Sequence, residues 1–563
     1  MTTQPTPMPA APAAAEHEAA GRGGWPVGSV ASLAGTRELL RFAVRRDRIL
    51  LPAWIYILTA VALSGGFGVR LVYKTAASRM RLAAGVRSDP TLSFIYGQLH
   101  GTTPGAIAAW RYLAYAALTA GLMSIFLVVR HTRADEESGR LELIGSTVVG
   151  RNAALAVALL LSLVANLAAA ATTTVVLMLS GLPATGALAF ALAEAGCGVV
   201  FATVAATAAQ ISGTARGARG IAIAALAVAF AVRAAGDAAA SGPSFLTWLS
   251  PIGWAEVVRP FTGDRWWVLV LPAATAVAGA VCTVALAGRR DQGAGLIAQR
   301  PGRPGASRWL SGPAGLAWRL QRGALAAWTA GFLLAGLAIG AVGRGIGQLV
   351  GSSGGVDSAL GKIGGLHGLT SAYLAACTSL LGLVAAGYAV AAVLRLSAEE
   401  SAERVEPLLA AGASRLRWGA SHLLVAVAGT GIVLAAGGLG TGLGYGLSVS
   451  QPGAQLARLL PAALAQWPAA LCVAGVAALL IGLRPAWSVP GAWTAFGICG
   501  LVGVLGPALN LPQAVLDLSP FTHVPRLPGG MFSIVPLLWL TLFVLAAVLA
   551  GAGGLRCRDI VTG

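Results

Sequence analysis

Two short acidic stretches hold most of the residues that could bind a partner. Residues 135–142 read DEESGRLE and residues 399–406 read EESAERVE. If the first stretch is helical, Glu136 and Arg140 are four residues apart and can form an ion pair. We interpret both stretches as short helices at a membrane surface that present carboxylates and an arginine outward for docking, with an ordinary solvated loop helix as the alternative. The candidate docking residues are Asp135, Glu136, Glu137, Arg140, Glu142, Glu399, Glu400, Glu403, Arg404 and Glu406.

Three polar residues interrupt long apolar runs elsewhere in the chain, namely Glu194, Gln466 and Asn166. A carboxylate within hydrocarbon is costly and is by default a functional hypothesis. We therefore expect these residues either to line a substrate pathway, with Glu194 also able to carry a proton, or to form hydrogen bonds between helices.

Several kinds of site are absent from the sequence. No G-x-x-x-x-G-K-[ST] loop is present, so the chain has no nucleotide-binding loop of its own. The six histidines are scattered, and the six cysteines show no metal-ligand spacing. We expect no catalytic residue, no metal site, no disulfide and no cofactor in this chain.

The elements that carry these residues must be membrane helices. Of the 563 residues, 56% are hydrophobic and 11% are charged, whereas a soluble domain has about 25% charged residues. The apolar runs reach the roughly 20 residues that a helix needs to cross the hydrocarbon. The fold class is therefore an all-α polytopic membrane protein. We expect twelve spans, at 50–69, 108–130, 152–179, 184–211, 220–236, 266–287, 324–343, 369–394, 419–447, 456–483, 489–509 and 532–551.

An internal repeat divides these spans into two parallel, pseudo-symmetric halves of six. The two acidic stretches align without a gap, so that Glu136 matches Glu400. At nearly the same offset, the LSP sequence at 249–251 matches the LSP sequence at 518–520, and Glu194 matches Gln466. We expect the halves at 36–288 and 316–563, a basic cytoplasmic linker at 289–315, and a disordered cytoplasmic tail at 1–35.

Charge orients the spans. The net charge is +18. If both termini are cytoplasmic, the cytoplasmic segments carry roughly twice as many Lys and Arg residues as the outer segments, which is the usual bias. We therefore expect both termini on the cytoplasmic side. We expect this excess to face anionic lipid and not nucleic acid.

Two further patterns indicate packing and closure. Glycines at 336 and 340, and at 438, 442 and 446, have the four-residue spacing of close helix contacts. Residues 249–261 and 518–528 each follow the fifth span of a half, and we interpret them as short elements that close the outer face.

The halves, with EES-GR-LEL (136–143) after span two and EES-AERVEPLL (399–409) after span eight, resemble the membrane subunit of an ABC-2 type exporter. The similarity is to the fused permease of the actinobacterial tetronasin-resistance type. The second copy departs from the pattern, since Ala402-Glu403 replaces Ser-Gly and Pro407 replaces Leu. The resemblance implies that two copies of a separate ATPase, which would bind ATP and Mg²⁺, dock on the acidic stretches. It also implies export of hydrophobic or amphiphilic compounds across the bacterial plasma membrane.

Two other functions are considered. A proton-coupled secondary transporter with the same twelve spans would use Glu194 and need no partner. A membrane-embedded transferase would need paired acids near an interface, and the outer loops offer only Asp89, Asp237, Glu256, Asp264, Asp357 and Asp517, without a convincing pair.

Overall fold

The computed structural model describes residues 33–88, 90–145, 149–239, 244–290, 293–297, 305, 312–351, 365–505 and 512–558. Every regular element within these ranges is helical, and eleven helices are long and apolar enough to cross a membrane. The expectation of an all-α polytopic membrane protein is therefore confirmed. The twelfth expected span, 489–509, is represented by α23 (Ser488–Leu505), which is not among the eleven, and the residues that follow it lie outside the described ranges.

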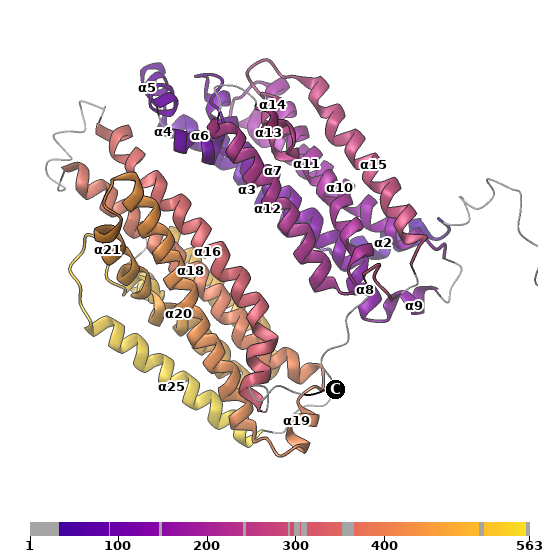
Figure 1. Cartoon of the computed structure of the whole chain (residues 1–563), viewed down its shortest axis with the longest axis vertical. Helices are drawn as coiled ribbons and strands as arrows, with labels where there is room; N and C mark the ends of the chain where they lie inside the picture. Colours follow the sequence, from indigo (N-terminus) through magenta and orange to yellow (C-terminus); the bar gives the residue numbers. More distant parts are fainter. Residues whose placement is uncertain are drawn as a thin grey trace, which may run out of the picture. The chain divides into compact units, whose positions relative to one another are not determined.

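Contacts divide the chain into two compact units (Figure 1). The first unit contains residues 1–74 and 100–299, and the second contains residues 75–99 and 300–563. The expected tail at 1–35 falls almost entirely outside the described ranges, as does most of the linker at 289–315.

The first unit is a bundle whose core helix is the alanine-rich α11 (Ala184–Ile211). Apolar residues occupy nearly every position of this helix, and most of its length is buried against its neighbours. The other long helices are α3 (Leu50–Leu63), α7 (Pro104–His131), α10 (Ala153–Leu179), α12 (Ala215–Ala239) and α15 (Val270–Ala287). The short elements are α2 (Thr36–Arg46), η1 (Ser64–Gly68), α4 (Val69–Val72), α8 (Arg133–Glu137), α9 (Arg140–Gly145), α13 (Phe245–Trp248), α14 (Pro251–Val257) and η2 (Trp266–Leu269).

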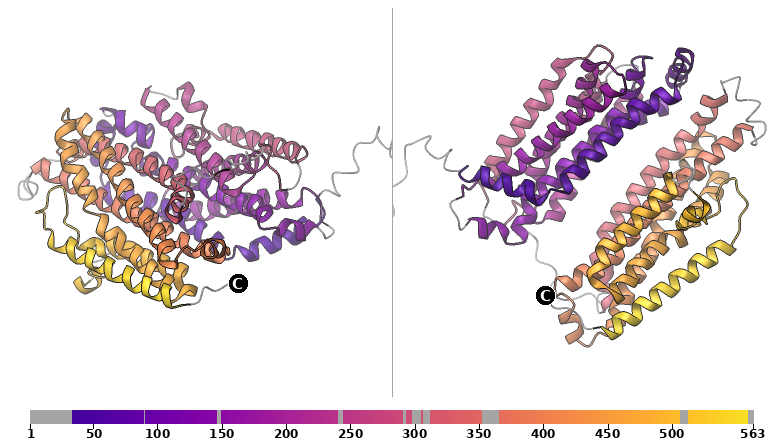
Figure 2. Two further views of the ribbon diagram at one scale, coloured as in Figure 1. Left: turned by 60° about the horizontal axis from the view of Figure 1, so that its bottom comes forward. Right: turned by 180° about the vertical axis from the view of Figure 1, so that it is seen from behind.

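The second unit is a bundle around α18, α20 and α22, seen from behind in Figure 2. Its long helices are α16 (Pro313–Gly351), α18 (Gly365–Ser401), α20 (Arg415–Ser448), α22 (Trp467–Leu483), α23 and α25 (Val535–Cys557). Its shorter elements are α5 (Ala76–Ser88), α6 (Pro90–Tyr96), α19 (Glu406–Ala410), α21 (Pro452–Leu464), η4 (Pro485–Trp487), α24 (Gln513–Leu516) and η5 (Pro520–Thr522). Helices α5 and α6 pack against α16.

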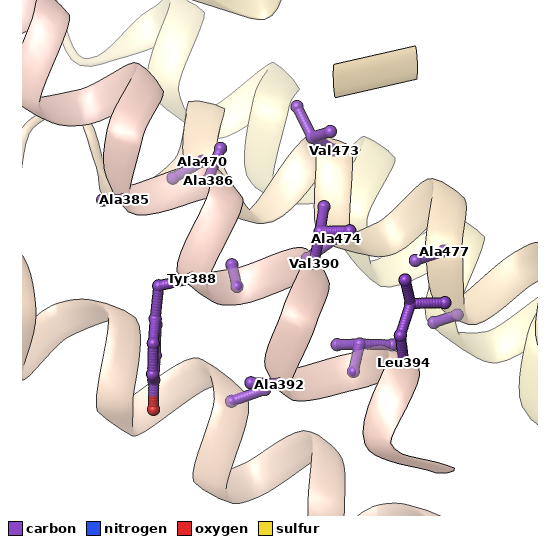
Figure 3. Packing of buried hydrophobic residues seen from close by; sticks show 14 of the residues in the cluster. Ala385, Ala386, Tyr388, Val390, Ala392, Leu394, Ala470, Val473, Ala474 and Ala477 are labelled. Atoms are coloured by element: carbon purple, nitrogen blue, oxygen red, sulfur yellow. The ribbon is translucent and has the colours of Figure 1, made fainter. Parts of the chain in front are cut away.

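Small residues set the spacing of the second unit's helices. In Figure 3, Ala385, Ala386 and Val390 of α18 lie beside Ala470 and Ala474 of α22. Because alanine side chains are short, the two helix backbones can approach closely, and van der Waals packing between them replaces the hydrophobic effect that lipid does not provide.

Glycines provide the closest contacts, as the sequence predicts. On α16, a Cβ at Gly336 or Gly340 would clash with the backbone of α20. Helix α20 has a second glycine face, where Gly438 and Gly442 lie against the backbone of α21. The predicted small-residue faces are confirmed, and α20 is held between two partners by glycines on two sides.

Candidate functional site

Both acidic stretches form a bend of the same design, which we call an acidic elbow. The first acidic elbow is residues 133–145, where α8 and α9 are separated by Gly139 at φ 71°. The second acidic elbow is residues 399–410, where α18 and α19 are separated by Glu403 at φ 55°. Gly139 and Glu403 match each other in the gap-free alignment of the acidic stretches, so the left-handed turn occupies the same position in each half. Glycine adopts this conformation freely, whereas a glutamate there is strained.

The first acid of each elbow is buried and bound by arginines. Asp135 accepts hydrogen bonds from Arg46 of α2 at 2.9 and 2.8 Å, and Arg140 approaches it at 3.5 Å. Its counterpart Glu399 binds Arg395 at 2.6 Å and has Arg404 at 3.5 Å. The predicted pairing of Glu136 with Arg140 is wrong, because the turn at Gly139 ends the helix between them and directs Arg140 toward Asp135.

The second acid of each elbow is bound by an arginine that follows the sixth long helix of its unit. Glu136 accepts from Arg290 Nη2 at 2.5 Å and Nη1 at 3.1 Å, and it also pairs with Arg133. Glu400 accepts from Arg558 Nη1 and Nη2, both at 2.6 Å. The carboxylate and guanidinium side chains of these two pairs are only 9–14% exposed. A two-nitrogen arginine–carboxylate contact at this burial fixes both position and orientation.

In each unit, a further arginine binds the backbone of the arginine that follows the sixth helix. Arg151, just before α10, donates to the carbonyl oxygen of Arg290 at 3.4 Å. Arg415, at the start of α20, donates to the carbonyl oxygen of Arg558 at 2.6 Å. Each elbow is therefore joined to the end of the sixth helix and to the start of the third.

The sequence places Arg290 in the basic linker expected at 289–315 and gives no separate role to Arg558. A signal was available, because each is followed by aspartate, giving Arg-Asp at 290–291 and at 558–559. The offset between these two dipeptides falls among those of the other repeat matches.

Burial divides the ten predicted docking residues into two groups. Asp135, Glu399 and Glu400 are buried and Glu136 is partly buried, so the expectation that all carboxylates point outward is wrong for these four. Glu137 is exposed, yet its Oε1 accepts the backbone N–H of Ala215 at the start of α12 at 3.0 Å. The exposed remainder consists of Arg140, Glu142, Glu403, Arg404 and Glu406.

The three polar residues predicted within spans all lie inside their units. Glu194 is 1% exposed on α11, its carboxyl group lies close to the Thr173 side chain of α10, and it forms no ion pair among the described residues. Asn166 donates to the Ser124 hydroxyl at 2.9 Å and packs against Gly198. These contacts join α10 to α7 and α11, which matches the helix-packing alternative for Asn166.

Gln466, the repeat counterpart of Glu194, is 2% exposed at the break between α21 and α22 and packs against Gly382. The fourth span of the second unit is interrupted here, whereas α11 is continuous.

The structure also joins two acids that had seemed unrelated. Arg233, buried on α12, pairs with Glu256 of α14 at 3.1 Å and with Asp237 at 3.5 Å. Burial, together with the neighbouring Asp237, raises the pKa of Glu256 well above its ordinary value, although Arg233 opposes the rise. Thr247 also donates to Asp237 at 3.1 Å. The two carboxyl groups, the guanidinium that they share and this hydroxyl form a structural ion cluster.

Comparisons with known proteins identify a relative and a family for this chain. The family described as "Multidrug efflux system permease Rv1217c, C-terminal domain" matches residues 310–558. The chain is 43% identical to the "Multidrug efflux system permease protein Rv1217c" of Mycobacterium tuberculosis (strain ATCC 25618 / H37Rv) over 530 residues, which cover 93% of this chain and 95% of that protein. The expected resemblance to an exporter permease is confirmed: this chain belongs to the family of the Rv1217c efflux permease.

Proposed function

We propose that this chain is the membrane subunit of an ATP-driven ABC-2 type exporter that moves hydrophobic or amphiphilic drugs out of a bacterial cell. The observation that carries the proposal is the duplicated link from acidic elbow to sixth helix, Glu136–Arg290 in one unit and Glu400–Arg558 in the other. The name of the relative, a multidrug efflux system permease, supports drugs as the cargo.

The elbows suit the transfer of a force from a partner. Each elbow has exposed charged side chains, including Glu142 in the first and Glu406 in the second. Each elbow also has a buried carboxylate that is bound to the end of the sixth helix of its unit. A partner that moves the exposed side therefore displaces the sixth helix through a short, rigid ionic contact and not through a flexible loop.

The partner is two copies of a cytoplasmic ABC ATPase, which bind ATP and Mg²⁺. This chain contributes no nucleotide-binding loop, because its sequence contains no glycine-rich P-loop motif. Closure of the ATPase pair moves the two elbows, and the two halves of the permease then open a path outward. Both termini and both elbows lie on the cytoplasmic side of the plasma membrane, in keeping with the distribution of Lys and Arg.

Co-purification tests this assignment. The full-length permease is expressed with a candidate ABC ATPase from the same organism, captured through a tag on the permease, and assayed for bound ATPase. Reversing the exposed charges with Glu142→Lys and Glu406→Lys is expected to reduce the captured ATPase at least about fivefold. The matched control, Glu142→Asp with Glu406→Asp, keeps the charge and is expected to retain the ATPase. Equal capture by the reversed and control variants would refute docking at the elbows.

A second candidate, a proton-coupled transporter, is favoured by one observation. The carboxyl group of Glu194 is buried beside Thr173 and has no ion-pair partner among the described residues, which suits a site that gains and loses a proton. Vesicles that contain the permease alone distinguish the two functions. Drug movement driven by a pH gradient, and abolished by Glu194→Gln, would support the proton-coupled transporter; no movement until ATPase and ATP are added supports the exporter.

A further inference from the structure

The second unit contains a cavity of about 780 Å³ bounded by α22, α23, α25 and the segment from Asp517 to His523. Its volume falls within the range of pockets that enclose drug-sized molecules. All of its lining residues belong to the second unit.

The repeat gives the first unit's equivalent segment as a reference for the segment that bounds this cavity. Trp254 Nε1–H donates to the carbonyl oxygen of Trp248 at 2.6 Å, and His523 Nε2 lies 3.0 Å from the carbonyl oxygen of Asp517. When the two LSP sequences are aligned, Trp248 matches Asp517 and Trp254 matches His523. The two segments therefore follow the same local course at this contact, although the first continues as the helix α14 and the second only as the short η5.

The serine of each LSP sequence fixes that course. Ser250 donates to the carbonyl oxygen of Ala229 on α12 at 2.7 Å, and Ser519 donates to that of Cys499 on α23 at 3.1 Å. In both units, the segment after the fifth long helix is thus held against that helix by one buried serine.

Side-chain size separates the two units at this point. In the first unit, Trp248 stacks on Trp267 with ring centroids 5.8 Å apart. The position of Trp248 is Asp517 and that of Trp254 is His523, while Trp267 falls on Pro536 at the LSP offset and on Val535 at the offset that joins Arg290 to Arg558. Side chains smaller than indole therefore occupy these positions in the second unit, and Asp517, His523, Val535 and Pro536 all line the cavity.

The lining has a definite chemistry. Its walls are apolar and include the aromatic side chains of Trp539 and Phe543. The charged lining residue is Asp517, which is exposed and accepts a hydrogen bond from Gln513 at 2.7 Å. No Lys or Arg is among the lining residues, although the whole chain has a net charge of +18. Aromatic faces and a carboxylate both attract a cation.

We propose that this cavity binds hydrophobic cations, with the apolar body against α22, α23 and α25 and the positive charge near Asp517. The inference deepens the proposed function, on which it rests, by giving the chemical class of one kind of cargo. A phospholipid is the less suitable occupant, because its phosphate would lie beside the carboxylate of Asp517 with no lining Lys or Arg to bind it.

Two probe ions of nearly equal size and opposite charge test the proposal. Tetraphenylphosphonium and tetraphenylborate are titrated against the full-length permease in nanodiscs of a neutral lipid, without ATPase or ATP, with empty nanodiscs as the blank. We expect the cation to bind the permease at least about tenfold more tightly than the anion, because the mouth bears a carboxylate and no lining Lys or Arg. Equal or tighter binding of tetraphenylborate would overturn the proposal.

Variants place the binding within the cavity. Ile498→Trp fills the wall on α23 and is expected to weaken cation binding at least about tenfold, while Leu549→Trp, a change at a 63% exposed residue of α25 that does not line the cavity, should alter it less than about twofold. Asp517→Asn is expected to weaken binding of the cation about threefold and to leave binding of the anion unchanged. If Ile498→Trp and Leu549→Trp bind the cation equally, the site is elsewhere and the proposal fails.

A retained lipid is the remaining outcome. If mass spectrometry finds a phospholipid bound to the wild type and lost from Ile498→Trp, and the cation does not displace it, the cavity is a lipid site and the proposal is wrong. The result of these binding experiments does not depend on the proposed function, since equilibrium binding needs no ATPase. Cation binding without ATP-driven export would refute the exporter and leave the cavity assignment standing, whereas export without cation binding would do the reverse.

Discussion

Replacing Arg558 with glutamine is expected to destabilise the second unit strongly, because Glu400 then loses both guanidinium contacts. These contacts are 2.6 Å long, and the two side chains are 14% and 9% exposed. Breaking such a pair leaves an uncompensated, nearly buried carboxylate, which costs about 3–5 kcal/mol. Arg404→Gln is the matched control, since its side chain is 62% exposed and lies 3.5 Å from Glu399. An exposed pair of this kind contributes about 0–1 kcal/mol.

A double-mutant cycle measures the contact itself. The variants Arg558→Gln, Glu400→Gln and the double substitution are compared by denaturant or thermal unfolding of the purified protein in one detergent. The double variant is expected to be more stable than the sum of the single changes predicts, by about 2–3 kcal/mol, because it removes both charges together. Strictly additive effects, or equal losses for Arg558→Gln and Arg404→Gln, would refute the reasoning.

Three further predictions concern packing, the elbow turn and pH. Gly340→Ala should cost at least about 2 kcal/mol in thermal unfolding because its Cβ meets the backbone of Thr441, while Gly331→Ala on the same helix, with open space around it, should be neutral or stabilising by up to about 1 kcal/mol. Glu403→Gly should stabilise the protein by about 1 kcal/mol, because glycine relieves the left-handed strain; a loss of stability in urea titration would contradict this. The pKa of Glu256 is raised in the folded protein, so its stabilising contribution is complete below the unfolded pKa of 4.5 and is lost as pH rises through the folded pKa. The melting temperature should therefore fall less steeply with rising pH for Glu256→Gln than for the wild type. Identical slopes of melting temperature against pH would disprove the assignment.

The fold was largely predictable, because membrane helices are encoded by long apolar runs that need no knowledge of tertiary contacts. Eleven of the twelve expected spans match helices that are long and apolar enough to cross a membrane, and the twelfth is represented by α23. The glycine faces at 336–340 and 438–446 were also readable, because four-residue spacing places them on one side of a helix.

The arrangement within the elbows was only partly predictable. Repetition located both acidic stretches, but helical spacing assigned Arg140 to Glu136, and the structure gives it to Asp135. The cause is local, since one left-handed residue reverses the chain between the two short helices. Which acids are buried depends largely on Arg46, Arg290 and Arg558, which come from distant parts of the chain.

Asymmetry between the halves was the hardest feature to predict. In the sequence, Asp517 is only one of several outer-loop acids, and it and His523 become informative only beside Trp248 and Trp254, the residues in the same places of the first unit. Their importance lies in size, because each is smaller than the matching tryptophan and both line the cavity.

ATP-driven export by the permease reconstituted with its ATPase tests the central claim most directly. The double variant Arg290→Gln, Arg558→Gln cuts both links between an acidic elbow and a sixth helix. At a temperature where this variant remains folded, we predict that the ATPase still binds and hydrolyses ATP while drug export falls at least about tenfold. Export at the wild-type rate would show that the motion does not pass through these arginines.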